Sequence, residues 1–472
     1  VVAKNRRFDV VVRFEDEFGN LTGLAPENTL IELSYQNIRE NLSWKLFVPE
    51  TGFIALPNLY FNEEAIYKIQ LKNLKTGETY FSPPIKCFAE SDLNLFWGLL
   101  HGESEKMDAK DSIEQCLKYF RDEKGYQFYS TSSFDGEEET STENWRLVAQ
   151  QVAEFNEEER FVAFLGQIWV GQPLEEGVRQ FLFLKDGKAL MRKKELKNNA
   201  LKKIYKTTPA KEFISIPLFT QNEKTGFDFK DFNPDFERVV EIYNAWGSAE
   251  NPKNQNLRSL SGKLTKELVD GTLQKALENN CRFGFVAGGL DDRSIFDGFY
   301  SSDQKQYSPG LTAIYARSQT REALFDALYN RHCYATTGAK IVLGFNIAGA
   351  PMGSELSTQT KPGLLYNRFI TGFVAGEKNL KEITIFRSGK VLAHFTPNES
   401  SFSFSLDDSE MLDKIALQPA QGAPFVYYYV RAVQENGEMA WGSPIWVDLL
   451  ERTPGLKKKK SSKPNGLLDF NL

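Results

Sequence analysis

The side chains best suited to binding metal ions are scarce in this chain. It contains three histidines, His101, His332 and His394, and four widely separated cysteines. Imidazole and thiolate are the donors that zinc and iron sites mostly use. A site built on several histidine ligands therefore needs more of them than this sequence can readily supply.

Other familiar catalytic patterns are missing or unsuited. The sequence has no GxSxG elbow, no Walker loop and no CxxC pair. His332 and Cys333 are neighbours, but adjacent side chains on a strand point to opposite faces, so they cannot act together as base and nucleophile. We expect the scattered cysteines to be buried free thiols in a reducing compartment.

Composition indicates a folded protein with several domains. The chain has 472 residues, of which 41% are hydrophobic and 13% aromatic, and this length predicts roughly two to four domains. A formal charge of −6 disfavours nucleic acid as a partner, and no apolar run approaches the ~20 residues of a membrane span. We therefore expect a cytoplasmic protein. The chain begins with Val1 rather than Met, so removal of a leader stays open.

Residues 1–92 predict a small β-sandwich. FDVVVRF at 8–14 alternates apolar and polar residues, and ENTLIELSY at 27–35 and AIYKIQLKN at 65–73 follow between turns. Short strands at such regular spacing are typical of sandwiches.

Residues 93–345 change to a mixed pattern of strands and helices. TENWRLVAQQVAEF predicts a helix with Thr142 as its N-cap, and TREALFDALYNRH predicts one with Thr320 as its N-cap. FVAFLGQIWV and FGFVAG are short, apolar and closed by glycine or polar residues, as buried strands are. This alternation indicates an α/β layered or barrel fold.

Residues 346–452 return to a β-rich pattern. EITIFRSGKVLAHF predicts a hairpin turning at Ser388-Gly389, and FVYYYVRAVQENGEMAWG predicts another turning at Asn436-Gly437. Residues 453–472 are rich in lysine and poor in apolar side chains, so we expect a flexible basic tail. Its end, LLDFNL after four lysines, could serve as a docking segment for another protein.

One long segment carries a family resemblance. PGLTAIYARSQTREALFDALYNRHCYATTGAKIVLGFNIAGAPMGSEL, residues 309–356, resembles the C-terminal signature of an uncharacterised group in the PHP (polymerase and histidinol phosphatase) superfamily. EIYNAWGSAE, WGLLHGES and RFVAFLGQIW resemble further blocks of that group. The resemblance implies a PHP-like distorted (β/α) barrel, with two or three divalent ions at the carboxyl ends of its strands. A metal-bound hydroxide there would attack an ester or amide.

Most ligand positions of that family hold other residues here. His101 keeps one histidine position, while apolar side chains without a lone pair replace ligands elsewhere. These replacements are Leu99, Phe134, Ile168, Val178 and Leu290. The possible donors that the resemblance leaves are His101, Glu103, Asp135, Asp291 and Asp292, with Glu250 as an outlier.

Three functional readings follow, and no residue is assigned a catalytic role. The first is a pseudoenzyme without metal or cofactor, retained to bind an unknown protein or small molecule, in which the apolar replacements converge and fill the former site. The second is a residual phosphoesterase-like hydrolase with one Mg²⁺ or Ca²⁺ on His101, Glu103, Asp291 and Asp292. The third is a glycan- or peptide-binding surface within residues 1–92. His332 and His394 are expected to be structural.

The scarcity of histidine predicts the metal content of the purified protein. Protein prepared without chelator should carry much less than one equivalent of zinc, iron or manganese, because His101 alone survives from the family's histidine positions. Elemental analysis measures this directly. A stoichiometric transition metal would show that the ligand positions had been aligned wrongly.

Overall fold

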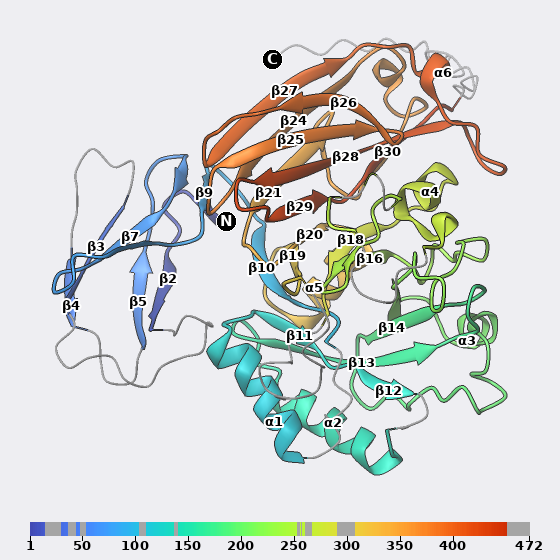
Figure 1. The fold of residues 1–472 in the computed structure, drawn as a ribbon, viewed down its shortest axis with the longest axis horizontal. Coiled ribbons are helices and arrows are strands. Elements are labelled where there is room, and N and C mark those ends of the chain that lie inside the picture. The colour runs from blue at the N-terminus through green and yellow to red at the C-terminus, as the bar shows by residue number, and fades with distance from the viewer. Residues whose placement is uncertain are drawn as a thin grey trace, which may run out of the picture.

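The computed structural model describes residues 1–14, 30–35, 44–47, 53–102, 110–135, 140–252, 255, 257–259, 267–289 and 307–450. In these residues the chain is mostly β-structure, arranged in several units (Figure 1). The first unit, blue in Figure 1, stands to one side of the rest of the molecule.

The first unit contains two sheets that face each other. Val12 and Ile31 pack together between them and are nearly inaccessible to solvent. A further small sheet of β1 (Val2–Ala3), β9 (Ile85–Phe88) and β6 (Ile66–Tyr67) adjoins this unit. The strands of the two main sheets are β2 (Phe8–Arg13) with β5 (Phe53–Leu59), and β4 (Trp44–Phe47), β3 (Leu30–Tyr35), β7 (Ile69–Asn73) and β8 (Thr79–Phe81) in that order.

One sheet of fourteen strands runs through most of the remaining chain. It crosses the predicted boundary at residue 345, because β20 hydrogen-bonds with β29. The division into units ending at about 92, 345 and 452 therefore stays a prediction. The strands are β10 (Asn94–Leu99), β11 (Phe128–Ser130), β12 (Ser133–Asp135), β13 (Val162–Val170), β14 (Val178–Phe183), β15 (Phe213–Leu218), β19 (Leu311–Ala316), β20 (Cys333–Thr336), β23 (Glu355–Ser357), β25 (Leu380–Arg387), β26 (Lys390–Phe395), β28 (Phe425–Gln434), β29 (Met439–Gly442) and β30 (Ile445–Asp448).

Two smaller sheets complete the fold. One contains β17 (Gly247–Ser248), β16 (Val239–Asn244) and β18 (Gly284–Ala287), with β16 and β18 parallel. The other covers the C-terminal part of the large sheet and shares one apolar core with it. Its strands are β22 (Ala350–Pro351), β21 (Val342–Ile347), β24 (Arg368–Ala375) and β27 (Ser401–Asp408).

The described strands do not close into the expected (β/α) barrel. β10, β11 and β13 are parallel, as a barrel requires, but β14 runs antiparallel to β13. The link between them is only residues 171–177, too short for the crossover that parallel neighbours need. Between β18 and β19 a side chain makes the hydrogen bonds that backbone groups make between paired strands. Thr312 Oγ1 donates to Ala287 O at 2.7 Å and accepts from Ala287 N at 3.0 Å.

The local predictions for helices are largely confirmed. α2 (Thr142–Phe155) forms, but its N-cap is Ser141 rather than Thr142, because Ser141 Oγ accepts from Asn144 N at 3.0 Å. α5 (Arg321–Tyr329) is capped by Thr320 as predicted. The other α-helices are α1 (Lys110–Lys118), α3 (Leu201–Thr207), α4 (Leu273–Glu278) and α6 (Leu412–Ile415); Tyr119–Glu123 is a π-helix, and Val269–Gly271 and Pro362–Leu365 are 3₁₀ turns.

Both predicted hairpins form where the sequence places their turns. β25 and β26 are antiparallel and joined at Ser388 and Gly389, whose φ angles are 49° and 76°. β28 and β29 are joined through Gly437, with φ 83°. Left-handed backbone at such positions matches the twist of paired strands. Separately, none of the helices in the described ranges is long and apolar enough to cross a membrane.

A buried ion cluster ties the C-terminal sheets together. Arg368 on β24 lies 3.0 Å from Asp408 on β27, and both side chains are nearly inaccessible. Tyr428 on β28 donates to Asp408 at 2.7 Å, and Arg387 approaches the same carboxylate at 2.8 Å. Burial opposes ionisation of Asp408, but the hydrogen bond from Tyr428 and the two guanidinium groups outweigh it and hold its pKa below the usual value.

Replacing Asp408 should therefore destabilise the C-terminal region. Asp408→Asn leaves Arg368 buried without its counter-charge and should lower the free energy of unfolding by about 3–5 kcal/mol. The neighbouring exposed residue gives a matched control, since Asp407→Asn should cost no more than about 0.5 kcal/mol. Urea denaturation followed by tryptophan fluorescence measures both. Equal stabilities would show that the cluster contributes nothing.

The same cluster predicts a dependence on pH. Because the folded pKa of Asp408 is lowered, its contribution is fully present above the unfolded value of about 3.9 and is lost as pH falls through the folded pKa. Asp408→Asn should lack this acid-sensitive part of the stability.

Candidate functional site

Two polar side chains meet at the carboxyl ends of β10 and β16. His101 is the second residue after the end of β10, and its Nδ1 lies 2.8 Å from Glu241 Oε2. Both side chains are about 2% exposed. Asn244 Nδ2 donates to the other oxygen, Glu241 Oε1, at 2.7 Å. The imidazole is thus held by a carboxylate that is itself fixed in orientation, while the ring of Phe219 presents its edge 5.8 Å away.

Two glycines after β18 allow the backbone to approach this pair. Gly289 N donates to His101 O at 2.5 Å. A Cβ atom added to Gly288 would lie 2.9 Å from His101 O and 3.1 Å from Glu241 Oε2. Gly289 has a φ of 84°, which side chains rarely adopt. The close approach of β18 to His101 therefore depends on these two residues lacking side chains.

This geometry suits an imidazole that acts through Nε2. A carboxylate that accepts a hydrogen bond from Nδ1 fixes the tautomer and raises the basicity of the other ring nitrogen. Such an arrangement serves general-base catalysis or metal ligation. A metal site needs further donors, however, and within the described ranges no three side chains of His, Cys, Asp or Glu come together to hold an ion.

Only part of the predicted donor set can be placed. His101 lies in the polar pair. Asp135 has its backbone in β12, opposite Trp169, and its side chain falls outside the description. Glu103, Asp291 and Asp292 also lie outside the described residues.

Glu241 was missed as a candidate, although its block EIYNAWGSAE was recognised. Its position inside the apolar segment VVEIYN could have identified it. A buried carboxylate requires a partner, so a charged residue in such a segment indicates a polar contact.

The three replacements whose side chains are described, Leu99, Ile168 and Val178, are buried, but they do not all meet. Leu99 packs in a core cluster with Tyr129 and Trp169. Ile168 and Val178 belong to a different cluster. The expectation that all five side chains converge is therefore wrong for Leu99. The side chain of Phe134, and Leu290 as a whole, lie outside the described part of the chain.

Glu250 is a structural anchor rather than a ligand. Its buried carboxylate accepts hydrogen bonds from Tyr429 at 2.9 Å, Trp441 Nε1 at 2.9 Å and Arg431 at 3.0 Å. These donors stand on β28 and β29, so Glu250 fastens the segment after β17 to the large sheet. Its oxygens are already occupied by protein donors.

The remaining histidines and the cysteines show no catalytic arrangement. His394 is exposed, with its Nδ1 3.1 Å from Thr384 Oγ1. His332 is partly buried, and burial together with the neighbouring Arg331 lowers its pKa. All four cysteines are free and buried, as predicted. Cys333 Sγ donates to Phe285 O at 3.6 Å.

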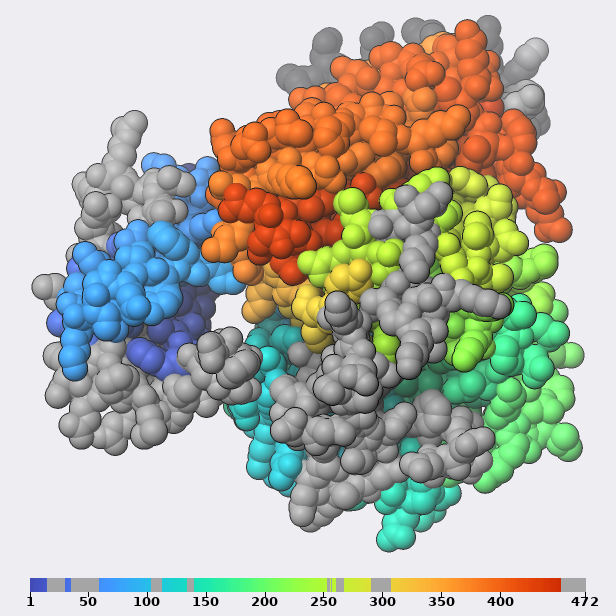
Figure 2. All heavy atoms as spheres, in the orientation of Figure 1, coloured from blue at the N-terminus to red at the C-terminus, as the bar shows by residue number. Residues whose placement is uncertain are grey.

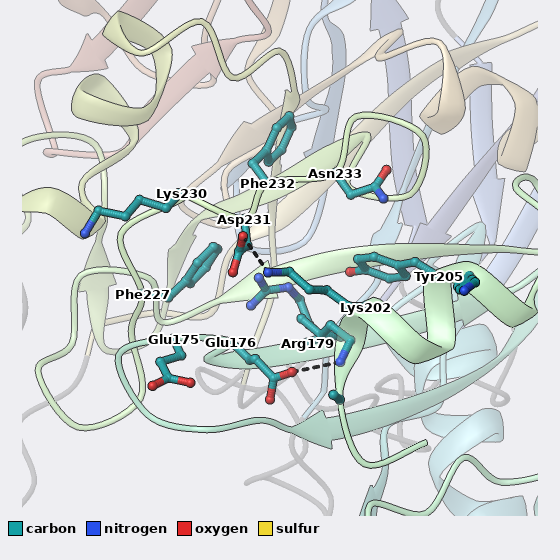
Figure 3. Close-up of a pocket in the computed structure, with 13 residues that line it drawn as sticks. Glu175, Glu176, Arg179, Lys202, Tyr205, Phe227, Lys230, Asp231, Phe232 and Asn233 are labelled. Carbon is teal, nitrogen blue, oxygen red and sulfur yellow. Dashed lines mark hydrogen bonds and ion pairs between the residues drawn. The ribbon is translucent and has the colours of Figure 1, made fainter. Parts of the chain in front are cut away.

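A separate pocket of about 550 Å³ lies beside α3 (Figure 3). The buried Arg179 lines it, but Arg179 Nε donates to Glu237 at 2.9 Å. Lys202 pairs with Asp231 at 3.0 Å, as the dashed line in Figure 3 shows. The charges that would attract a ligand to this pocket are therefore largely neutralised by partners within the protein.

Comparison with known proteins finds close relatives in Chlamydia. An uncharacterised protein of Chlamydia pneumoniae is 55% identical over 450 residues, which are 95% of this chain and 72% of that protein. One from Chlamydia trachomatis serovar D is 52% identical with the same coverage. A family described as "Protein of unknown function (DUF3604)" matches residues 290–361. This match includes residues 309–356 and confirms that the segment resembles a family of unknown function.

Among solved structures, one similar protein comes from Bacteroides vulgatus. It is described as a two-domain protein containing a predicted PHP-like metal-dependent phosphoesterase. The alignment covers 75% of this chain and 96% of that chain, with 10% identity and a TM-score of 0.35.

The buried thiols predict low reactivity. Burial raises the pKa of Cys281 and of Cys333 to about 12, so almost no thiolate exists at pH 8. An aromatic disulfide reagent should therefore label far less than one thiol per native chain and all four after denaturation. Absorbance of the released thiolate measures this. Rapid labelling of one cysteine in the native protein would reveal an accessible nucleophile.

Proposed function

The chain belongs to the family of these uncharacterised chlamydial proteins, and we propose that it is a binding or scaffolding protein built on a PHP-like hydrolase framework. In this proposal the ancestral metal centre has been largely lost. The ligand is an unidentified protein or small molecule.

The observation that carries the proposal is the burial of apolar side chains at former ligand positions. Leu99, Ile168 and Val178 are 0%, 4% and 7% exposed. Such side chains offer no lone pair, and each contributes roughly 1.5–3 kcal/mol to folding when buried. Restoring a ligand at one of these positions would cost stability without rebuilding a cluster of donors. The burial of these side chains therefore supports the proposal that the fold serves binding or scaffolding.

The polar pair at His101 supports the same proposal. One carboxylate oxygen of Glu241 is hydrogen-bonded to His101, and the other accepts a hydrogen bond from Asn244. A carboxylate engaged in this way stabilises the protein and is less available to a cation. The pair therefore also works as a structural link between β10 and β16, which are 140 residues apart at these positions.

A second candidate function rests on the same contact. Histidines that bind metal commonly donate their other ring N–H to a carboxylate, and His101 has this arrangement. On this alternative, His101 with Glu103, Asp291 and Asp292 would hold one hard cation, and the chain would be a residual phosphoesterase-like hydrolase. The site would have to bind the ion mainly through oxygen.

Titration with divalent ions separates the two candidates. The binding or scaffolding proposal predicts that Mg²⁺, Mn²⁺ or Ca²⁺ gives no saturable rise in melting temperature. An ion at 100 times its Kd would instead stabilise the fold by about 2.7 kcal/mol, which is a shift of several degrees. Differential scanning fluorimetry at constant ionic strength measures the shift.

Two histidine variants supply the control. His101→Asn should abolish a shift caused by the alternative site, whereas His394→Asn, on an exposed hairpin strand, should leave it intact. A saturable shift lost only in His101→Asn would overturn the proposal in favour of the residual hydrolase. Hydrolysis of a phosphomonoester that shows the same dependence would establish that activity.

A further inference from the structure

A pocket of about 690 Å³ lies at the end of β16 and β18 opposite to His101. Its wall includes Arg238, which directly precedes β16, and Arg282, which lies two residues before β18. Arg331, two residues before β20, also lines it. A segment of the C-terminal region, residues 418–421, forms another wall. Figure 2 shows the orange C-terminal region packed against the yellow-green chain around α4.

Arg331 is buried with one nitrogen unsatisfied. Its side chain is 6% exposed. Nε donates to Gly353 O at 3.0 Å and Nη2 to Glu355 at 2.6 Å. Nη1 finds no acceptor among the described residues. The backbone of Arg331 has a φ of 63°, a conformation that is costly for a long side chain and is often kept at functional positions.

Arg238 adds a second guanidinium, and no carboxylate within the described chain pairs with it. It donates to Tyr329 O at 2.7 Å and to Pro234 O at 2.9 Å. It also stacks on the Tyr329 ring at 4.7 Å. Burial and the repulsion from Arg238 lower the pKa of Arg331 to about 10, so these two cations are close enough to interact unfavourably.

The nearby carboxylates do not balance the three arginines. Arg282 pairs with Glu355 at 2.7 Å and with Asp448 at 2.5 Å. Arg331 shares Glu355 with Arg282. The other charged side chains of the wall have partners, since Lys230 pairs with Asp228 and Lys275 lies 3.8 Å from Glu278. In the described structure the pocket therefore has an excess of positive charge at Arg238 and Arg331.

The pocket also offers apolar wall surface. Phe232 is partly buried, and Pro234 and Pro419 also line the pocket. We propose that this pocket binds a small organic oxyanion, whose carboxylate or phosphate is held by Arg238 and Arg331 while its apolar part lies against Phe232. Guanidinium groups bind both kinds of oxyanion through charge-assisted hydrogen bonds. The ligand would supply the missing negative charge.

This site is independent of the proposed metal-free framework. It is formed at the amino ends of β16 and β18, whereas His101 and Gly288 lie at their carboxyl ends. It adjoins the pocket beside α3, with which it shares Lys230 and Phe232, but in that pocket Glu237 already neutralises Arg179. A failure of one proposal would thus leave the other standing.

Isothermal titration of the full chain tests the proposal with benzoate and phenyl phosphate as probes. Inorganic phosphate and chloride at equal ionic strength serve as comparisons. We expect saturable binding of at least one aromatic probe, weakened tenfold or more in Arg238→Met. Arg238 is partly exposed, so this variant should fold. Preference between the two probes identifies carboxylate or phosphate as the natural head group.

Two further variants make the result specific. Arg331→Lys keeps the charge but removes the planar donor pair, and it should also weaken the probe. Lys202→Gln changes a cation in the pocket beside α3 and should leave the affinity within twofold of the parent. Absence of saturable binding, or equal affinity in the parent and Arg238→Met, would overturn the proposal. Equal binding of chloride would likewise show only general salt effects.

Discussion

The pairing of β20 with β29 holds the main part of the molecule together. Without it, the backbone groups on the outer edge of β20 would need other partners, because buried N–H and C=O groups are rarely left unpaired. Through this ladder the strands that begin at β10 continue into the C-terminal strands. β29 also carries Trp441, which donates to Glu250. These backbone hydrogen bonds, together with a shared apolar core and the ion pair of Glu250 with Arg431, join the two halves of the chain.

The strands β16 and β18 then present two different electrostatic environments. At their carboxyl ends, the negative charge of Glu241 is matched by His101 and by the amide of Asn244. At their amino ends, Arg238, Arg282 and Arg331 gather around fewer carboxylates. Elsewhere the buried carboxylates Glu250 and Asp408 each have cationic and hydrogen-bonding partners. Among these arginines, Arg331 Nη1 has no acceptor within the described residues, and an unmet buried donor costs about 1–3 kcal/mol.

The apolar side chains of Leu99, Ile168 and Val178 are buried in the hydrophobic interior. Leu99 joins one hydrophobic cluster, while Ile168 and Val178 join another. These three side chains are thus divided between two hydrophobic clusters. Each cluster gains stability from them separately.

The sequence by itself determined the features that depend on neighbouring residues. The hairpin at Ser388-Gly389, the Thr320 cap of α5 and the buried strand β13 follow from turn chemistry, capping and apolar periodicity. The burial of all four cysteines also followed from composition. The predicted N-cap of α2 was wrong by one residue. Ser141 and Thr142 can both cap a helix, and only the backbone conformation decides which of them does.

Only the tertiary structure decided the partners of residues far apart in the chain. Glu241 meets His101 across 140 residues, and no local pattern specifies such a pairing. β13 and β14 have the apolar character of barrel strands, yet their short connection makes them antiparallel. Nothing in the local sequence distinguishes Arg331 from its neighbours. Only the folded chain places Arg238 and Arg282 beside it. Periodicity reports which side chains are buried, whereas the packing of separate strands decides which charges they meet.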